Sequence, residues 1–295
     1  MAQTISTDMY RPDVWEDIAQ AEFNGKTKVA GSPAVLVDDT LAGQPGETVE
    51  FPKWMALTDL DDLSEGTAMT PEKLSQSSSK ATIKEAGKAV EITDKAKLTG
   101  IGNAQDEAIR QFGELAARKV DGDLITVATA TVSGGITYAD GSTATDSAPL
   151  NFTVTGSTDL TLGWSALVDA MGEAGDDFEP DEWSGLYIRS EQQGQLMKDD
   201  AFIHASEVSA GGPGSVVGRG FFGQIGGLPV YVTNRLTANT ATILKRNSLG
   251  LMYKRRPVVE QDRDILARST VVTTNLHYAV KRLNDKGVIY INASA

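Results

Sequence analysis

The chain has 295 residues, of which 40% are hydrophobic and 23% are charged, so its composition is that of an ordinary globular protein with a sizeable core. It contains no cysteine, which excludes disulfide bonds, thiolate metal sites and a cysteine nucleophile. No apolar run approaches the ~18 residues of a membrane span and the first residues lack a signal-peptide core, so we expect a protein that stays in the cell that made it, with no membrane partner.

The net charge of −13 is unevenly distributed. Between Lys245 and Lys286 there are ten lysines and arginines and four acidic residues, a local charge of +6, so the remainder carries −19. The basic residues either form a solvated face or meet an acidic partner, which in a self-assembling protein can be another copy of the chain. In the second case, assembly should weaken as ionic strength rises.

Residues 1–40 are expected to form an N-terminal arm. Apolar residues between 14 and 23, among them Trp15 and Phe23, are spaced for one face of a short helix. The segment that follows is polar and is broken by Gly31 and Pro33. Such a stretch cannot bury its own apolar residues, so we expect it to be ordered only against another surface.

Residues 41–98 are expected to form an extended β-hairpin. Thr48–Trp54 alternates between apolar and polar residues, and Pro52 places this strand at an edge. Ala81–Thr93 alternates again, and the acidic, then serine-rich residues 59–79 predict the tip of the loop. Because an isolated hairpin is only marginally stable, we expect this one to lie on something else, such as another subunit.

Residues 103–132 predict one long amphipathic helix, for which the rest of the chain has to supply a surface. Its apolar residues recur every three or four positions: Ile109, Phe112, Ala116, Val120, Leu124 and Val127. Asn103 stands at the N-cap position and Asp106 follows three residues later. Gly113 and Gly122 each cost a helix about 1 kcal/mol relative to alanine, so we expect close backbone approach or bending there.

The next residues alternate between strand and helix signals. Residues 133–158 predict a β-hairpin insertion with alternations at Ile136/Tyr138 and Phe152/Val154. A helix is expected at 159–172 with Ser157 or Thr158 as its cap, a strand at 185–189, a helix at 190–200 capped by Ser190, and a strand at 228–233. This order indicates a compact α/β domain over 159–248.

The last part of the chain is rich in strands, which we expect at 249–253, 257–260, 269–274, 277–283 and 287–291. These strands could supply the sheet on which the helix at 103–132 lies.

The sequence offers little chemistry. Gly218–Gly223 matches the pattern G-x-G-x-x-G, but a strand follows it instead of a helix, so a turn-rich loop is the better interpretation. His204 and His277 lie in different segments, and the acidic cluster Asp59–Glu65 lacks the spacing of a calcium loop. We therefore predict no catalytic residues, no metal site and no cofactor.

The order of these elements is distinctive: arm, extended hairpin, long helix, α/β domain and terminal strands. Nearly the whole chain resembles the major capsid proteins of tailed bacteriophages, whose Hong Kong 97-type fold is also found in encapsulin shells. The segments that carry the resemblance are DTLAGQPGETVEFPKW (39–54), ATIKEAGKAVEITD (81–94), QFGELAARKVDGDL (111–124), GQIGGLPVYVTNR (223–235) and LGLMYKRRPVVEQDRDILARSTVVTTNLHYAVKRLNDKGV (249–288).

The resemblance implies an α+β fold with five parts. These are an N-terminal arm (1–40), an extended β-hairpin loop (41–98), a peripheral domain with a long spine helix on a β-sheet (99–132 and 249–283), a β-hairpin insertion (133–158) and an axial α/β domain (159–248 and 284–295).

The resemblance also implies the function. The chain would be a self-assembling structural subunit of an icosahedral phage head that encloses double-stranded DNA, and not an enzyme. It would reside in the virion after assembly in the host cytoplasm. Expected partners are many copies of the chain as pentamers and hexamers, a portal, scaffolding or decoration proteins, and packaged DNA through non-specific proximity.

Two alternatives stay open: an encapsulin-type compartment shell made by a cell, and a cytoplasmic enzyme that holds a phosphate on the loop at Gly218. Four aromatic residues, Trp15, Phe23, Phe51 and Trp54, are candidate subunit-interface anchors, because aromatic side chains dominate interface energetics. For each of them, a contact within its own subunit is an equal alternative.

Overall fold

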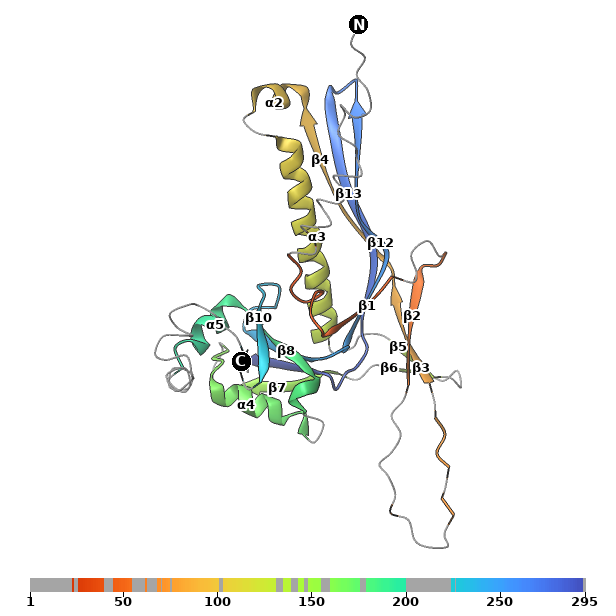
Figure 1. Cartoon of the computed structure of the whole chain (residues 1–295), viewed down its shortest axis with the longest axis vertical. Coiled ribbons are helices and arrows are strands. Elements are labelled where there is room, and N and C mark those ends of the chain that lie inside the picture. Colours follow the sequence, from red (N-terminus) through yellow and green to blue (C-terminus); the bar gives the residue numbers. More distant parts are fainter. Residues whose placement is uncertain are drawn as a thin grey trace.

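The computed structural model in Figure 1 describes residues 23, 26–39, 45–54, 62, 68–69, 71–74, 76–100, 103–130, 135–138, 143–145, 148–154, 160–175, 179–199, 224–225 and 227–293. The described residues form three β-sheets and four α-helices: α2 (Asp94–Thr99), α3 (Ala104–Thr129), α4 (Trp164–Gly172) and α5 (Ser190–Leu196). Figure 1 shows three branches: an elongated part that contains α3, a rounded part that contains α4 and α5, and a short sheet beside them.

Helix α3 lies along a four-stranded sheet, called here the long sheet. Its order is β1 (Val35–Asp38), β12 (Leu249–Asp264), β13 (Ser269–Arg282) and β4 (Lys84–Thr93). Only the β1–β12 pair is parallel. Buried side chains of α3, such as Val120 and Leu124, share an apolar core with Leu251 and Tyr278 of the sheet. The predicted helix and its predicted surface are therefore confirmed, and at ~1.5 Å per residue the helix is roughly 40 Å long.

A six-stranded sheet forms the rounded part together with α4 and α5. Its order is β7 (Leu150–Val154), β14 (Val288–Ala293), β11 (Thr240–Lys245), β8 (Trp183–Ile188), β10 (Leu228–Val232) and β9 (Gln224–Ile225). Every residue of β8 is buried, as expected for a central strand that is covered on both faces. Leu167 of α4 and Leu196 of α5 pack into the same core as Leu186.

The short sheet contains β2 (Thr48–Trp54), β3 (Gln76–Thr82), β5 (Gly135–Tyr138) and β6 (Thr143–Thr145), in that order. Its base packs on the long sheet, where Phe51 meets Met252 and Ala279. Met252 and Ala279 are adjacent in their strands to Tyr253 and Tyr278, whose side chains face α3. Because successive side chains of a strand point to opposite faces, the helix and the short sheet cover opposite faces of the long sheet.

The predicted extended hairpin is wrong in its second strand. Only the part up to Thr82 pairs with β2, and Lys84–Thr93 pairs instead with β13. The serines expected in the loop tip belong to β3, which pairs with β2 on one side and with β5 on the other. Pairing on both edges outweighs the weak strand propensity of serine, a context effect that local patterns do not contain.

The predicted hairpin insertion is divided between two sheets. Its first part forms the hairpin β5–β6 beside β3, whereas Leu150–Val154 runs parallel to β14. The sequence did not predict β1 or β11, and it divided β12 and β13 into two strands each. Pro257 lies inside β12, but β1 pairs only with residues 249–252 of that strand, so the missing N–H of Pro257 removes no bond to β1.

Two helices begin on caps that come from distant residues. The caps predicted at Ser157 or Thr158 are wrong, since α4 starts after Gly163 and the Trp164 N–H donates to the carboxylate of Asp199 at 2.7 Å.

Ser190 is the first residue of α5 and not its cap. Its N–H and its hydroxyl both donate to the Asn234 side-chain oxygen, at 3.1 and 3.0 Å.

The N-terminus of α3 agrees with the prediction. The Asn103 side chain accepts the Gln105 N–H at 3.1 Å, and its amide donates to Asp106 at 2.7 Å. The expectation of close approach at Gly122 is wrong, because a Cβ atom there would meet nothing within 4 Å. Gly113 is buried.

Candidate functional site

Histidine and acidic side chains are the groups of this chain that could bind a metal ion or act in catalysis. Within the described ranges, no group of three or more His, Cys, Asp or Glu side chains is placed to hold a metal ion. His277 is half-buried, with its Nε2 3.6 Å from the Glu85 carboxylate. His204, the Gly218–Gly223 loop and most of the Asp59–Glu65 cluster lie outside the described residues. The same part of the chain contains no helix long and apolar enough to cross a membrane. The candidate functional features are therefore exposed surfaces and the buried polar contacts that hold the elements of the fold together.

Two of the four predicted interface anchors are buried against their own chain. Phe23 is 3% exposed and meets Tyr253 edge to face, with ring centroids 6.3 Å apart. Phe51 is also 3% exposed. A Cβ atom on Gly250 would lie 2.6 Å from the Phe51 ring, so the glycine makes room for it. A side chain with so little free surface has none to offer a neighbour, and for both residues the structure agrees with the intrachain alternative.

The other two predicted anchors stay predictions. Trp15 lies outside the described residues. The backbone of Trp54 ends β2 opposite Gln76, and its side chain lies outside the described part of the chain.

Asp121 of α3 holds the arm stem, residues 26–39, against the helix. Its buried carboxylate accepts three consecutive backbone N–H groups, from Lys28 (2.7 Å), Val29 (3.2 Å) and Ala30 (2.9 Å). Hydrogen bonds to an ionised acceptor are stronger than neutral ones. The stem is thereby fixed at one position along α3. A signal for this residue existed in the sequence, because Asp121 shares a helix face with apolar Leu124.

Burial raises the pKa of the Asp121 carboxyl group above its usual value, although the three backbone hydrogen bonds act in the opposite direction. The folded chain therefore binds a proton at Asp121 more readily than the unfolded chain. The contribution of this group to stability is largest at low pH and declines as pH rises through the folded-state pKa.

Further contacts tie the arm stem to both large sheets. The Ser32 hydroxyl donates to the Val29 carbonyl at 2.6 Å and accepts the hydroxyl of Tyr187, on β8, at 2.6 Å. Burial raises the pKa of Tyr187 to about 12, so this phenol remains a donor at neutral pH. The last part of the stem is β1, which pairs with the first residues of β12. The stem therefore joins α3, the long sheet and the six-stranded sheet.

Arg282, at the end of β13, closes the C-terminus of α3. Its buried guanidinium donates through Nη1 to the carbonyl oxygens of Val127 (3.2 Å), Ala128 (3.1 Å) and Ala130 (2.6 Å). Its Nε donates to Asp285 at 2.6 Å. The last carbonyl groups of a helix lack hydrogen-bond partners within the helix and carry partial negative charge. A guanidinium donates the missing hydrogen bonds and supplies a compensating positive charge. Nothing in the local sequence pattern predicted this residue.

Asp123 holds the other side of α3 to the long sheet. Its carboxylate accepts the Tyr278 hydroxyl at 2.7 Å and lies 2.9 Å from Lys119 and 3.5 Å from Lys84. Burial alone would raise the pKa of Asp123, but these hydrogen bonds and lysines hold it below its usual value. Two residues correspond to ~200° around a helix, so Asp121 and Asp123 fix α3 from opposite sides.

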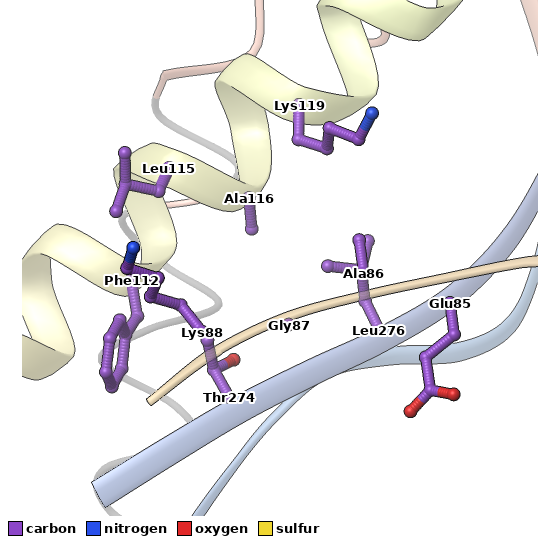
Figure 2. A pocket seen from close by; sticks show the side chains of 10 residues that line it. All are labelled: Glu85, Ala86, Gly87, Lys88, Phe112, Leu115, Ala116, Lys119, Thr274 and Leu276. Atoms are coloured by element: carbon purple, nitrogen blue, oxygen red, sulfur yellow. The ribbon is translucent and has the colours of Figure 1, made fainter. Parts of the chain in front are cut away.

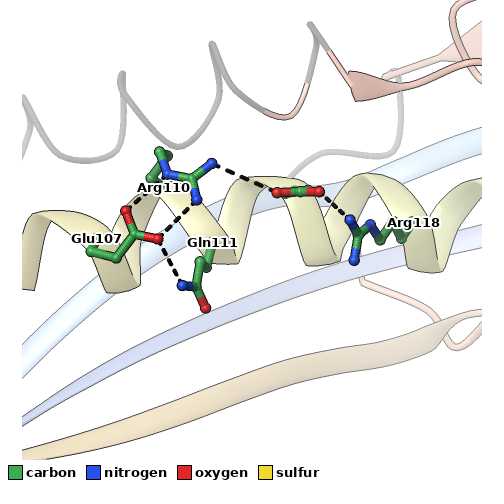
Figure 3. Close-up of polar contacts among 5 residues, drawn as sticks. Glu107, Arg110, Gln111 and Arg118 are labelled. Carbon is green, nitrogen blue, oxygen red and sulfur yellow. Dashed lines mark hydrogen bonds and ion pairs between the residues drawn. The ribbon is translucent and has the colours of Figure 1, made fainter. Parts of the chain in front are cut away.

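The exposed face of α3 carries a ladder of alternating charges (Figure 3). Arg110 pairs with Glu107 at 2.8 Å and with Glu114 at 3.7 Å, and Arg118 also pairs with Glu114. Hydrogen bonds from Arg110 and Gln111 lower the pKa of Glu107 to about 2. Exposed pairs of this kind contribute little to stability. Their effect is that the charges of this face compensate one another along the helix.

A groove of about 460 Å³ opens between α3 and β4 (Figure 2). Phe112 and Ala116 line it from the helix, and Leu276 lines it from β13. Leu115, at its side, is 43% exposed. The groove is mostly apolar, and it offers a contact surface and no constellation for catalysis.

The chain is similar to phage capsid proteins in sequence and in fold. A family model described as phage capsid protein matches residues 76–291. The major capsid protein of Staphylococcus phage phiMR11 is 28% identical over 293 residues, which covers 98% of this chain and 95% of that protein.

Solved capsid structures share the fold at low sequence identity. The capsid of cyanophage P-SCSP1u has a TM-score of 0.67 at 15% identity, covering 91% of this chain and 89% of that one. The structure from Mycobacterium phage Che8 has a TM-score of 0.65 at 14% identity, covering 87% and 89%. The predicted α+β, Hong Kong 97-type fold is thereby confirmed.

Proposed function

The chain belongs to the phage capsid protein family, and we propose that many copies of it assemble, as pentamers and hexamers, into an icosahedral head that encloses double-stranded DNA. It is a phage major capsid protein and a component of the virion. The observation that carries the proposal is the family match over residues 76–291, which includes α3, most of the six-stranded sheet and all strands of the other two sheets except β1 and β2.

We also propose that the protein has no enzymatic activity. In the described part of the chain, the buried carboxylate of Asp121 and the buried guanidinium of Arg282 are engaged in structural hydrogen bonds. Equilibrium dialysis with a labelled nucleotide tests the alternative in which the Gly218 loop holds a phosphate, and specific binding would contradict our proposal. The alternative of an encapsulin-type compartment shell made by a cell is not favoured, because the matching family model describes phage capsid proteins and the Staphylococcus phage relative is a major capsid protein.

The domain roles are part of the proposal, with boundaries adjusted to the sheets. The long sheet with α3 would be the peripheral domain, and the six-stranded sheet would be the axial domain around the five- and six-fold axes. Residues 48–82 would form the loop that reaches a neighbouring subunit, with Trp54 as an anchor, and Trp15 would anchor the arm. A portal, and scaffolding or decoration proteins, would complete the set of partners.

Electron microscopy of the purified protein tests the proposal directly. We expect icosahedral shells, or their pentamers and hexamers, in negative stain. A chain that remains monomeric at high concentration, under several assembly conditions, would contradict it.

A further inference from the structure

The edge of the long sheet beside α3 is open. Strand β4 pairs with β13 along its whole length, and within the described ranges no strand pairs with its other edge. Every second residue of an edge strand directs its N–H and C=O groups away from the sheet, so such an edge can accept a further strand. The groove of about 460 Å³ between α3 and β4, here called the edge groove, lies beside this edge (Figure 2).

The edge groove is mostly apolar, with one polar group on its floor. Phe112 and Leu115 line its wall on α3, and Leu276 lines its floor. Thr274, also on the floor, is only 7% exposed, and its hydroxyl oxygen has no hydrogen-bond partner in the described part of the chain. Buried polar groups are hydrogen-bonded in the great majority of cases, so this hydroxyl can bond to a polar group that enters the groove.

The length of the edge groove sets the size of its occupant. Phe112 and Lys119 are the first and last residues of α3 that line it. They are separated by about two turns, which corresponds to roughly 10 Å along the helix. A strand rises about 3.4 Å per residue, so roughly three residues of an extended chain span this distance. The first and third side chains of such a segment point to the same side and can enter the groove together, while its backbone pairs with β4.

The rim of the edge groove is basic. Lys84, Lys88 and Lys119 are exposed there. Asp123 pairs with Lys84 and Lys119, whereas Lys88 has no acidic partner among the described residues. Glu85 also borders the groove, but Figure 2 shows its carboxylate pointing away from α3. The charge ladder on the exposed face of α3 is compensated within itself, so the remaining positive charge favours an occupant with acidic residues.

The arrangement of the faces favours a separate protein as the occupant. Helix α3 and the short sheet cover opposite faces of the long sheet, so the residues between β2 and β3 start from the face opposite the edge groove. In a shell, all copies present the same face to the same surface, so the corresponding residues of a neighbouring copy also start on the far side. This choice of occupant rests on the proposed function, whereas binding to the groove does not.

We propose that β4 and the edge groove form a docking site for an extended, acidic segment of a separate protein. The segment adds a strand to β4 and places two apolar side chains, two residues apart, in the groove. On the same side of the segment, a carboxylate lies against Lys88. The backbone hydrogen bonds supply affinity, and the groove and the lysine supply specificity.

The first test measures the binding of labelled peptides to unassembled subunits by fluorescence anisotropy. The probe SETVTVTES places its two valines and two glutamates on one side of an extended chain, and it reads the same in both directions, so it suits either orientation on β4. The control SVTETETVS has the same composition with the valines and glutamates exchanged. We expect the probe to saturate below about 1 mM and to bind at least about tenfold more tightly than the control.

Subunit variants, each checked for folding by circular dichroism, locate the site. Lys88→Glu should weaken binding of the probe at least about fivefold, because an attraction becomes a repulsion. The charge-exchanged probe SKTVTVTKS should bind Lys88→Glu more tightly than it binds the wild type. Leu115→Ser, which removes part of the apolar wall, should also weaken binding of the probe. The matched control Lys95→Glu changes an exposed lysine of α2 outside the groove and should bind the probe as the wild type does.

Three results would overturn the docking site: no saturation by the probe, equal binding of probe and control peptide, or unchanged binding in Lys88→Glu. The lysines of β4 would then only protect an exposed sheet edge. A peptide of residues 54–66 of this chain that binds as tightly as the probe would overturn the separate protein as occupant, in favour of another copy. Failure of the wild-type chain to form shells would refute the proposed function and leave binding of the probe unchanged.

Discussion

Replacing Asp121 by asparagine should loosen the arm stem without unfolding the protein. The asparagine oxygen can still accept the N–H groups of Val29 and Ala30, which both bond to Oδ1. The other oxygen, which accepts the Lys28 N–H at 2.7 Å, becomes an NH₂ group that faces a donor. Losing one hydrogen bond to a charged acceptor costs about 1.5–3 kcal/mol, or a factor of roughly 10–150 in the population of the open stem.

The expected effect lies at the lower end of that range, because asparagine also removes the cost of burying a carboxylate. Trypsin can measure it, since Lys26 and Lys28 are exposed and lie in the stem. When opening is fast relative to cleavage, the cleavage rate follows the population of the open form. We expect cleavage after these lysines, followed by mass spectrometry on unassembled subunits, to accelerate about tenfold in Asp121→Asn.

The matched control is Asp123→Asn, which removes contacts to the long sheet and none to the stem. Its cleavage rate at Lys26 and Lys28 should equal that of the wild type. Two results would refute the reasoning: an acceleration below about threefold in Asp121→Asn, or the same acceleration in the control. Either would mean that the Asp121 carboxylate does not hold the stem.

Three further predictions concern α3. Arg282→Met should lower the free energy of unfolding by about 3–5 kcal/mol in urea titrations, because it leaves Asp285 and the helix carbonyls without their buried partner; a loss below about 1 kcal/mol would contradict this role. Gly122→Ala should raise the free energy of unfolding by about 1 kcal/mol, since a Cβ atom there meets nothing within 4 Å, and a destabilised subunit would show that the space is filled. Because the folded-state pKa of Asp123 is lowered, its contribution to stability is present above the unfolded value near 4 and is lost as pH falls through the folded pKa. Asp123→Asn should therefore lose less stability than the wild type between pH 7 and pH 3 in urea titrations, and an equal loss would exclude that contribution.

The parts of the fold that the sequence predicts are those whose causes lie close together in the chain. Helix α3 is such a part, because its apolar period and its Asn103 cap are readable within a few residues. The contacts of Asp121 and Arg282 join residues that lie far apart in the chain: Asp121 meets Val29 across 92 positions, and Arg282 meets Ala128 across 154. The caps of α4 and α5 come from residues 35 and 44 positions away. No window of local sequence contains both partners of these contacts.

Strand alternation predicts that a face is buried but not what covers it. The alternation of Thr48–Trp54 indicates correctly that Phe51 faces an apolar surface. The surface is the chain's own long sheet, and the room for the ring comes from Gly250, about 200 positions later. The interpretation of Phe51 as an interface anchor therefore could not be decided from the strand itself.

Charge counts along the sequence have the same limitation, because they do not show which charges pair within the subunit. The segment from Lys245 to Lys286 has a local charge of +6, but three of its cations pair with acidic residues elsewhere in the chain: Arg256 with Asp39, Arg263 with Asp94, and Lys245 with Glu182. These pairs compensate half of the excess within the subunit. An acidic neighbour would therefore meet a much weaker field than the count implies, and the dependence of assembly on ionic strength should be correspondingly shallow.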